Sequence, residues 1–519
     1  MGVLELLKKT ERTTNDSNTK NFKVLFVLPD FNYVEEYMPD YSGSFSLGLG
    51  YVSAMLKKHE FQTSLIHLTN NIPKKEFVKR IKDENPDLIG FSIFSHQRAD
   101  AEKYVGFIRD AKINIPIIIG GVHATTDPED AIRIKGVNYV CVGEGEYPLL
   151  DLCNTLYEQK NTTNIPNIWV KEKQKIIQNE IRPLLQNLDE LSFPDREMFD
   201  YKNLSDTKMG VFNVLATRGC PYNCTYCCNH VYQKIYKNKG KYVRFRKPEF
   251  VIQEIKEGLK KYPYLKYVNL EDDAFCLDKK FVKEFSKEFK KKIGKPFNAN
   301  TRVNLINDEV AKNLSKGGCI HVAVGIESGN QQIREKILKR FMTNEQIHNA
   351  IKTCHKYGIT VGTYNIIGLP QESIKNVLET IKLNVKSKAD SMHVSIFQPY
   401  PNTELYNYCI KNKMIKNSKV STFFGEYLLK NNTITKEEVT FAYKYFYIYA
   451  KVYKTIGKLK IIEKTLDKTF TAKKTHKLQL AIYPIMFFIT NPMIAIYRIM
   501  MNISPKATRK IKYLILGRK

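Results

Sequence analysis

Residues 218–230 read Arg-Gly-Cys-Pro-Tyr-Asn-Cys-Thr-Tyr-Cys-Cys-Asn-His. Within this stretch Cys220, Cys224 and Cys227 are separated by three and then two residues, so one short loop can surround one metal centre. Three thiolates from one loop suit three irons of an iron-sulfur cube and leave the fourth iron open to an external ligand. An open iron indicates chemistry rather than a structural role.

Two other interpretations of this loop stay open at the level of sequence. Zinc more often takes two Cys-x-x-Cys pairs or paired Cys and His ligands. The sequence has no second Cys-x-x-Cys pair, but a zinc knuckle with His230 as its fourth ligand is compatible with the spacing. Cys228 directly follows Cys227 and is a second candidate for the third thiolate.

The pattern Cys-x-x-x-Cys-x-aromatic-Cys, with Arg218 and Tyr226 in their usual places, resembles the signature of the radical S-adenosylmethionine (SAM) superfamily. The resemblance implies that Cys220, Cys224 and Cys227 hold a 4Fe-4S cluster whose open iron is chelated by the amino and carboxylate groups of SAM. It also implies reductive cleavage of SAM to a 5′-deoxyadenosyl radical. An electron donor such as flavodoxin or ferredoxin is then required.

From residue 211 onward, apolar runs alternate with helical segments. The strand candidates are 211–217, 267–270, 297–301, 321–326, 360–367 and 391–397. This alternation predicts a partial (β/α)6 barrel of parallel strands. Functional groups of parallel barrels gather at the carboxyl ends of the strands. The polar residues that follow each run are therefore candidate site residues.

By the same resemblance, residues at these strand ends contact SAM. Glu327 lies in Gly-Ile-Glu-Ser-Gly at 325–329, a motif in which the family uses Glu to bind ribose hydroxyls. Arg302 can pair bidentately with the SAM carboxylate. The acidic triplet 271–273 is either a SAM contact or a solvated turn, and 365–370 resembles the motif that holds adenine. The predicted SAM contacts are Tyr226, Glu271, Asn300, Arg302, Glu327, Ile366 and Gly368.

The first third of the chain predicts a doubly wound, Rossmann-like parallel sheet. An apolar run at 23–28 precedes a helix expected at 47–58, and further apolar runs recur at 87–93, 115–119 and 139–142. Such sheets bind ligands at the carboxyl ends of their strands. Several of these ends are rich in glycine, which allows a ligand to approach the backbone closely but is also ordinary turn chemistry.

Taken in order, the motifs at 46–51, 90–92, 120–125 and 143–146 resemble the cobalamin-binding domain that precedes many radical SAM domains. The resemblance implies that the cobalamin contacts are Ser92, Gly120, Gly121, Gly143 and Glu144. No Asp-x-His-x-x-Gly follows the first strand, so no histidine is offered there to cobalt. His96 and His123 are not assigned as axial ligands, because a lone histidine at a strand end is more often a satisfied polar group.

We expect four regions: a cobalamin-binding-like domain at 20–155, a linker at 156–205, a radical SAM core at 206–420 and a helical C-terminal region at 421–519. Residues 440–519 hold 17 Lys and Arg against two acids, and 478–497 carry no charge. An apolar stretch beside basic residues favours peripheral membrane contact. The alternative is that it covers the open side of the barrel or forms a dimer contact.

The ten cysteines and the polar first 21 residues point to a cytoplasmic protein. The net charge of +29 reflects lysine richness along the whole chain, so nucleic acid is not an expected partner. The oligomeric state and the identity of the substrate are not predicted.

Three functions are compatible with these motifs. The first is a cobalamin-dependent radical SAM enzyme that abstracts hydrogen from an unactivated carbon, followed by methyl transfer or cyclisation. This class includes anaerobic magnesium-protoporphyrin monomethyl ester cyclases and class B methylases, and the tail suggests a lipid-like or other hydrophobic substrate. The second is a methylthiotransferase acting on tRNA or protein, although the N-terminal domain offers only Cys141 and Cys153 for its extra cluster. The third is a non-catalytic corrinoid or iron-sulfur sensor.

Overall fold

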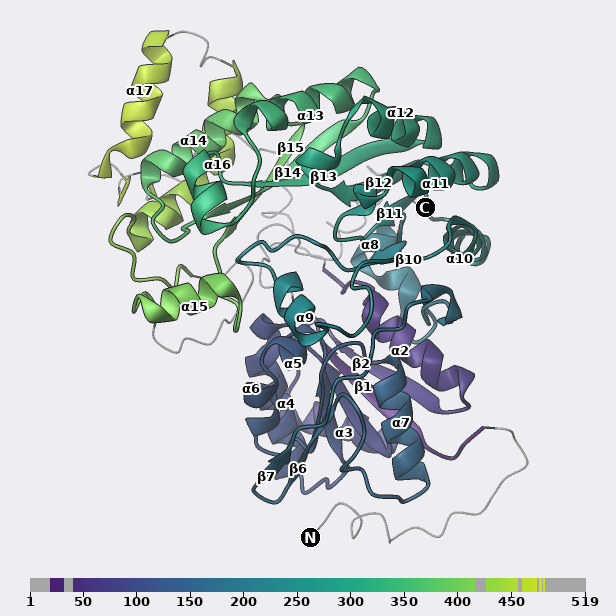
Figure 1. Ribbon diagram of the computed structural model, residues 1–519. Coiled ribbons are helices and arrows are strands. Elements are labelled where there is room, and N and C mark those ends of the chain that lie inside the picture. The colour runs from purple at the N-terminus through teal and green to yellow at the C-terminus, as the bar shows by residue number, and fades with distance from the viewer. Residues whose placement is uncertain are drawn as a thin grey trace, which may run out of the picture.

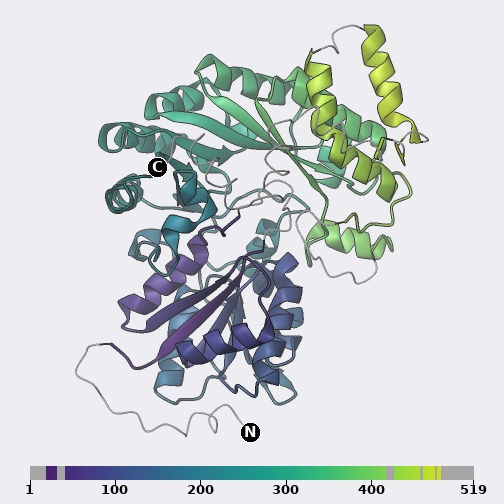
Figure 2. The same cartoon turned by 180° about the vertical axis from the view of Figure 1, so that it is seen from behind.

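The computed structural model describes residues 19–31, 41–415, 426–455, 460–473, 476–477 and 479–480. It consists of an N-terminal sheet with helices on both faces, a second sheet above it, and a helical end at the side of the second sheet (Figure 1). The view from behind shows the same two bodies stacked on each other (Figure 2). The α/β fold class expected from the sequence is confirmed.

The N-terminal sheet is doubly wound. Its strand order is β2-β1-β3-β4-β5-β6-β7, in which the first five strands are parallel and the last two antiparallel. The strands are β1 (Lys23–Pro29), β2 (Gln62–Leu68), β3 (Leu88–Ser92), β4 (Ile117–Gly120), β5 (Tyr139–Cys141), β6 (Ile168–Glu172) and β7 (Lys175–Ile177). The sheet therefore continues into residues that the sequence placed in the linker.

Helices cover both faces of this sheet because alternate strand residues point to opposite sides. In β1, Val24 and Phe26 face a core shared with α2 and α7, whereas Leu25 and Val27 face a core shared with α3 and α4. The helices are α2 (Leu47–Lys58), α3 (Lys74–Glu84), α4 (Arg98–Asp110), α5 (Val122–Thr126), α6 (Pro128–Arg133) and α7 (Glu146–Tyr157).

The second body contains the six parallel strands that the sequence predicted, in the order β15-β14-β13-β12-β11-β8. These are β8 (Val211–Val214), β11 (Tyr267–Leu270), β12 (Phe297–Thr301), β13 (Cys319–Glu327), β14 (Thr360–Ile367) and β15 (Ser391–Ile396). A short hairpin of β9 (Thr217–Arg218) and β10 (Arg244–Phe245) follows β8. The sheet does not close on itself, so the partial barrel is confirmed.

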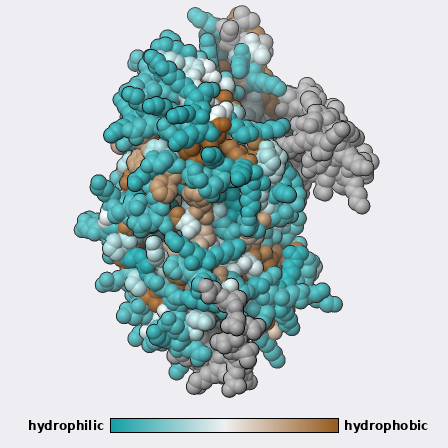
Figure 3. Space-filling model, turned by 90° about the vertical axis from the view of Figure 1, so that its right-hand side faces the viewer, coloured by the Kyte–Doolittle hydropathy of each residue, from teal (hydrophilic) through white to brown (hydrophobic). Residues whose placement is uncertain are grey.

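Helices cover the outer side of the barrel sheet. They are α10 (Pro248–Lys261), α11 (Lys279–Lys292), α12 (Asp308–Gly317), α13 (Asn344–Lys356) and α14 (Ile374–Lys386), with the shorter α8 (Ser205–Lys208), α9 (Asn229–Ile235) and α15 (Glu404–Lys411) nearby. One hydrophobic cluster joins the two bodies: it runs from Phe26 through the connector residues Leu191 and Phe199 to Val268 and Val322. The right-hand face in Figure 1, seen head-on in Figure 3, is largely hydrophilic.

Two C-terminal helices, α16 (Lys436–Thr455) and α17 (Lys460–Thr471), pack beside the barrel edge. Phe441 and Phe446 of α16 and Phe470 of α17 are buried in a cluster with α14 and β15. The Val394 N–H of the edge strand donates to the Tyr447 hydroxyl at 3.3 Å. α16 therefore packs against the edge strand β15, whereas the apolar stretch 478–497, for which the sequence left open a cover of the barrel, is not placed by these contacts.

Within the described parts of the chain, none of the helices combines the length and the apolar character needed to span a bilayer. The uncharged stretch 478–497, on which the expectation of membrane contact rests, lies outside the described residues apart from 479 and 480.

Candidate active site

The cysteine loop begins where β9 ends and is held at both sides. A Cβ at Gly219, where φ is +89°, would lie 2.5 Å from the Tyr242 carbonyl oxygen, so the entry to the loop requires glycine. Thr225 fixes the middle: its N–H and hydroxyl donate to the carbonyls of Leu338 and Ile337 at 3.2 and 2.6 Å. The loop is thus attached to the segment that follows β13.

The three thiols face one cavity of about 340 Å³. Cys220 and Cys224 are buried, and Cys227 is half-buried. Arg302 Nη1 lies 3.2 Å from the Cys224 sulfur, and Asn229 Nδ2 lies 3.6 Å from the Cys227 sulfur. Donors at these distances stabilise thiolates, which is the protonation state that an iron-sulfur cluster requires. The donor set therefore fits a 4Fe-4S cluster.

The same geometry disfavours a zinc knuckle. The described residues contain no set of three or more Cys, His, Asp or Glu side chains that converge on a single metal ion. The Nε2 atom of His230 instead accepts a hydrogen bond from the Glu404 N–H at 3.0 Å. Cluster thiolates each bond a different iron and need not converge on one point. These contacts give no support to His230 as a zinc ligand.

Most of the predicted SAM contacts come together around this cavity. Its lining residues are Cys220, Tyr222, Cys224, Tyr226, Cys227, Asn229, Glu271, Asp272, Asp273, Asn300, Thr301, Arg302, Ala323, Gly325, Glu327, Arg340 and Tyr364. Ile366 and Gly368 lie further along the end of β14 and are not part of the lining. The Gly368 N–H donates to the Glu372 carboxylate at 2.6 Å.

Glu327 lies at the end of β13 in a strained conformation, with φ at +66°. Its carboxylate accepts a hydrogen bond from the Tyr226 hydroxyl at 2.8 Å and lies 3.7 Å from Arg340. Burial raises the pKa of Glu327, and the Arg340 charge opposes that rise. The side chain is thus held in place at a position where a carboxylate can accept hydroxyl donors.

Arg340 is a lining residue that the sequence did not reveal. It follows the short helical turn η6 (Ile333–Ile337) and carries no motif of its own. Its Nη1 atom lies 3.5 Å from the Cys224 sulfur and 3.1 Å from the Tyr226 hydroxyl. Arg302 lies 3.2 Å from the same sulfur, so two arginines flank the Cys224 thiol. Arg302 also stacks on the Tyr222 ring, with its guanidinium carbon 3.7 Å from the ring centroid.

The three residues of the acidic triplet 271–273 differ in burial and in their contacts. Glu271 and Asp273 are exposed toward the cavity, whereas Asp272 is buried. Asp272 accepts hydrogen bonds from the Thr217 hydroxyl at 2.6 Å and the Ala216 N–H at 3.1 Å, and burial raises its pKa to about 7. Asp272 therefore fixes the strand end that leads into the cysteine loop.

In the N-terminal sheet, three of the predicted cobalamin contacts lie side by side. Ser92 and Gly120 are register partners at the ends of β3 and β4, and Gly121 follows with φ at +94°. A Cβ on Gly121 would lie 2.7 Å from the Ile93 carbonyl oxygen. This bare stretch of backbone at a strand end fits a slot for a large ligand.

The two histidines near this slot have other roles. His123 is buried, and its ring nitrogens lie 3.3 Å from the Ser95 hydroxyl and 3.1 Å from the Asp130 carboxylate. His96 is buried and stacks on Phe94, and burial lowers its pKa to about 4. His123 thus contacts polar groups of its own domain, at Ser95 and Asp130.

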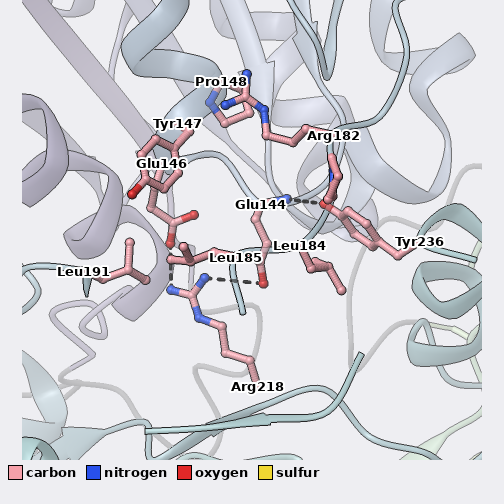
Figure 4. Close-up of a pocket in the computed structure, with 11 residues that line it drawn as sticks. Glu144, Glu146, Tyr147, Pro148, Arg182, Leu184, Leu185, Leu191, Arg218 and Tyr236 are labelled. Atoms are coloured by element: carbon pink, nitrogen blue, oxygen red, sulfur yellow. Dashed lines mark hydrogen bonds and ion pairs between the residues drawn. The ribbon is translucent and has the colours of Figure 1, made fainter. Parts of the chain in front are cut away.

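The remaining predicted cobalamin contacts, Gly143 and Glu144, face the barrel domain. The Glu144 carboxylate pairs with Arg244 and lies 3.5 Å from Arg218, and Arg218 pairs with Glu146 at 2.6 Å. Glu144, Glu146 and Arg218 line a cavity of about 150 Å³ between the two bodies (Figure 4). Because Arg218 immediately precedes the cysteine loop, this ion network joins that loop to the end of β5.

Comparison with known proteins defines the class. The model of the radical SAM superfamily matches residues 214–383, and the model of the B12 binding domain matches residues 43–152. The chain is therefore a radical SAM enzyme with a cobalamin-binding domain in front of its barrel. Its cofactors are a 4Fe-4S cluster, SAM and cobalamin.

The relatives place the chain more narrowly. It is 31% identical over 402 residues to an uncharacterized methyltransferase of Pyrococcus horikoshii, a match that covers 76% of this chain and 85% of the relative. It is 23% identical to the anaerobic magnesium-protoporphyrin IX monomethyl ester cyclase of Rubrivivax gelatinosus, covering 65% of this chain and 61% of that protein. The chain belongs to the family of cobalamin-dependent radical SAM methyltransferases and cyclases.

A solved structure shows the same fold. The cobalamin-dependent SAM radical enzyme OxsB, with aqua-cobalamin and SAM bound, superimposes with a TM-score of 0.64 at 18% sequence identity. The match covers 96% of this chain and 75% of OxsB.

Proposed function

We propose that this enzyme transfers a methyl group to an unactivated carbon of a small-molecule substrate. One observation carries the proposal: the cysteine loop, Glu327 and Arg302 line a single cavity next to a cobalamin-binding domain. The similarity to the Pyrococcus methyltransferase favours methyl transfer over cyclisation, because that match extends over 85% of the relative.

When bound, the cluster supplies the electron that cleaves SAM to a 5′-deoxyadenosyl radical, and cobalamin supplies a methyl carrier. The chain provides the binding and orienting groups. Cys220, Cys224 and Cys227 hold the cluster, and Arg302 is positioned to pair with the SAM carboxylate. Glu327, oriented by the Tyr226 hydroxyl and Arg340, accepts the ribose hydroxyls. Asn300 and Glu271 provide further polar contacts beside SAM.

The test is anaerobic reconstitution with iron, sulfide and cobalamin, followed by reduction with dithionite in the presence of SAM. We expect the wild type to release 5′-deoxyadenosine, and the triple variant Cys220→Ala, Cys224→Ala, Cys227→Ala to release none. Glu327→Gln serves as a second variant and is expected to weaken SAM binding about tenfold while keeping the cluster spectrum. A wild type that binds the cluster but releases no 5′-deoxyadenosine contradicts the proposal.

The methylthiotransferase alternative receives no support from the N-terminal domain. Cys141 and Cys153 are buried, and burial raises the pKa of the Cys141 thiol to about 12. Buried thiols of this kind are structural rather than cluster ligands. A hydrophobic substrate, a peripheral membrane site, and a flavodoxin or ferredoxin as electron donor stay predictions from the sequence.

A further inference from the structure

The inner face of the barrel sheet, which is the side that lines the active-site cavity, is polar along its whole width. Strand residues in register share a face, and one row across five strands reads Asn213, Asn269, Asn298, His321 and Thr360. Hydrogen bonds link neighbours in this row: Asn269 Nδ2 donates to Asn213 Oδ1 at 3.2 Å, and His321 Nδ1 lies 2.8 Å from the Thr360 hydroxyl. The base of the barrel is therefore lined by amide, imidazole and hydroxyl groups.

Nearer the cluster, the inner face has a floor of small residues between polar walls. Ala323 and Gly362 are register partners, with Asn300 on one side and Ser391 on the other. A Cβ at Gly362 would lie 2.8 Å from His321 Nε2 and 2.9 Å from the Ser391 hydroxyl. Glycine at this position therefore lets the His321 ring and the Ser391 hydroxyl approach the backbone, so these polar groups lie over the floor.

The third row completes the wall beside the SAM contacts. Gly325, Tyr364 and His393 are register partners, and the Tyr364 and His393 rings meet edge to face at 5.8 Å. Tyr364 is 43% exposed, which is unusual for so large a side chain inside a barrel. It lines the cavity together with Glu271. These side chains are accessible to a molecule that enters the barrel.

The charge of this surface is opposite to that of the chain as a whole. The net charge is +29, yet no Lys or Arg occupies an inner-face position in the six barrel strands as the structure describes them. Arg302 and Arg340 lie at the cluster end, next to the Cys224 sulfur. Glu271 and Asp273 are the exposed charged groups on the cavity wall. The space over the inner face of the barrel sheet, away from the cysteine loop, therefore favours neutral or positively charged ligands over anions.

An apolar occupant would be poorly accommodated here. Covering amide groups with hydrocarbon leaves them unsatisfied, which costs about 1–3 kcal/mol for each group. Asn298 already has a side-chain oxygen that is buried without a hydrogen-bond partner among the described residues. A ligand that brings hydroxyl, amide or amine groups can hydrogen-bond the exposed Ser391 and His393 side chains of the same face, whereas a lipid chain cannot.

We propose that the substrate of this enzyme is a hydrophilic molecule, rich in hydroxyl or amide groups and neutral or positively charged, that binds to the polar inner face of the barrel. This inference rests on the proposed function, because it assigns the molecule that meets the radical. It differs from the hydrophobic substrate suggested by the C-terminal tail, which is a feature outside the barrel.

The test uses full-length protein reconstituted with cluster, cobalamin and SAM but left unreduced, so that binding is measured without turnover. Four probes that each change one property are compared by saturation-transfer NMR: glucosamine, glucose, glucose 6-phosphate and geraniol. We expect glucosamine and glucose to bind, and glucose 6-phosphate and geraniol to bind at least about tenfold more weakly. Glu271→Gln is expected to reduce the preference for glucosamine over glucose.

Two variants locate the binding site. His393→Leu replaces an exposed inner-face ring, and Asn298→Leu replaces a half-buried amide at similar volume. Each is expected to lower glucosamine affinity about five- to tenfold, while Asn412→Leu, on the exposed end of α15, leaves it unchanged. Stronger binding of geraniol or glucose 6-phosphate, binding that neither inner-face variant alters, or no binding by either sugar overturns the inference. A failure of the proposed function is seen separately, as absent 5′-deoxyadenosine after reduction.

Discussion

At the scale of single residues, two adjacent thiols are candidates for the third ligand of the cluster. Cys227 lines the active-site cavity beside Cys220 and Cys224, whereas Cys228 does not line it. We therefore predict that Cys228→Ser retains about four irons per chain, and that Cys227→Ser loses most of them. Iron and sulfide analysis after anaerobic reconstitution measures both. Loss of iron in Cys228→Ser with retention in Cys227→Ser would reverse the assignment.

Glu372 is a second residue whose environment should have a measurable effect, here on the pH dependence of stability. It is fully buried, its carboxylate accepts the N–H groups of Gly368 and Leu369, and burial raises its pKa to about 8. An acid whose pKa is higher in the folded state stabilises the fold at low pH. That contribution is lost as pH rises from the unfolded pKa, about 4.5, through about 8.

We therefore predict that Glu372→Gln removes part of the pH dependence of stability. Between pH 5 and pH 8.5 the wild type should lose on the order of 2 kcal/mol more unfolding free energy than the variant. Urea unfolding at both pH values, followed by circular dichroism, gives the comparison. Parallel pH profiles for the two proteins would show that Glu372 keeps its ordinary pKa.

The residues of the site differ in how far their sequence context reveals them. The three cysteines stand in a spaced motif, and Glu327 stands in a motif whose role the family resemblance implies, so both enter one hypothesis from the sequence. Arg340 has no motif, and only the path of the chain after β13 carries it to the Cys224 sulfur. Asp272 belongs to the acidic triplet, but its burial beneath the β9 strand depends on tertiary packing that a local pattern does not encode.

At the scale of elements, the barrel strands at 267–270, 297–301 and 360–367 have the predicted bounds. In the first two, buried residues that face the helices alternate with less buried residues that face the cavity, a pattern that local sequence carries. The edge strand β2 was missed: its sequence Gln-Thr-Ser-Leu-Ile-His-Leu is largely polar, since an edge strand is less buried. The strands β6 and β7 were missed because they are short and lie in a stretch that the sequence indicated as a linker with few strong apolar runs.

The packing of α17 yields a prediction with a control on the same helix. Phe470 is fully buried and contacts the rings of Phe441 and Tyr449, with centroids at 5.2 and 4.8 Å, whereas Ile461 is 81% exposed. Phe470→Ala should lower the free energy of unfolding by about 3 kcal/mol or more, and Ile461→Ala should change it by less than about 0.5 kcal/mol. Thermal unfolding distinguishes the two. Equal effects would mean that α17 does not pack on α16 in solution.

At the scale of the whole molecule, the two domains share one hydrophobic cluster and a group of ion pairs at its edge. The hydrophobic cluster holds the two domains together, but apolar contacts are non-directional and do not by themselves fix how one sheet is rotated relative to the other. The Arg218–Glu146 pair adds a directional contact, and its side chains are only 17% and 7% exposed. The sequence shows Arg218 as part of the cysteine motif but does not show its partner, which lies 72 residues away.

The last prediction concerns this pair. Arg218→Met leaves Glu146 as a buried charge without its partner and should lower the free energy of unfolding by about 3 kcal/mol. Glu146→Gln should cost less, because Arg218 then still has Glu144 at 3.5 Å. The double variant should be more stable than the sum of the single losses implies, with a coupling energy of about 1–2 kcal/mol.

The matched control is the exposed pair of Glu129 and Arg133 on α6, where a coupling below about 0.5 kcal/mol is expected. Urea unfolding of all variants gives both cycles. A coupling no larger than the control would mean that the Arg218–Glu146 pair does not help to set the position of the cysteine loop relative to the cobalamin-binding domain.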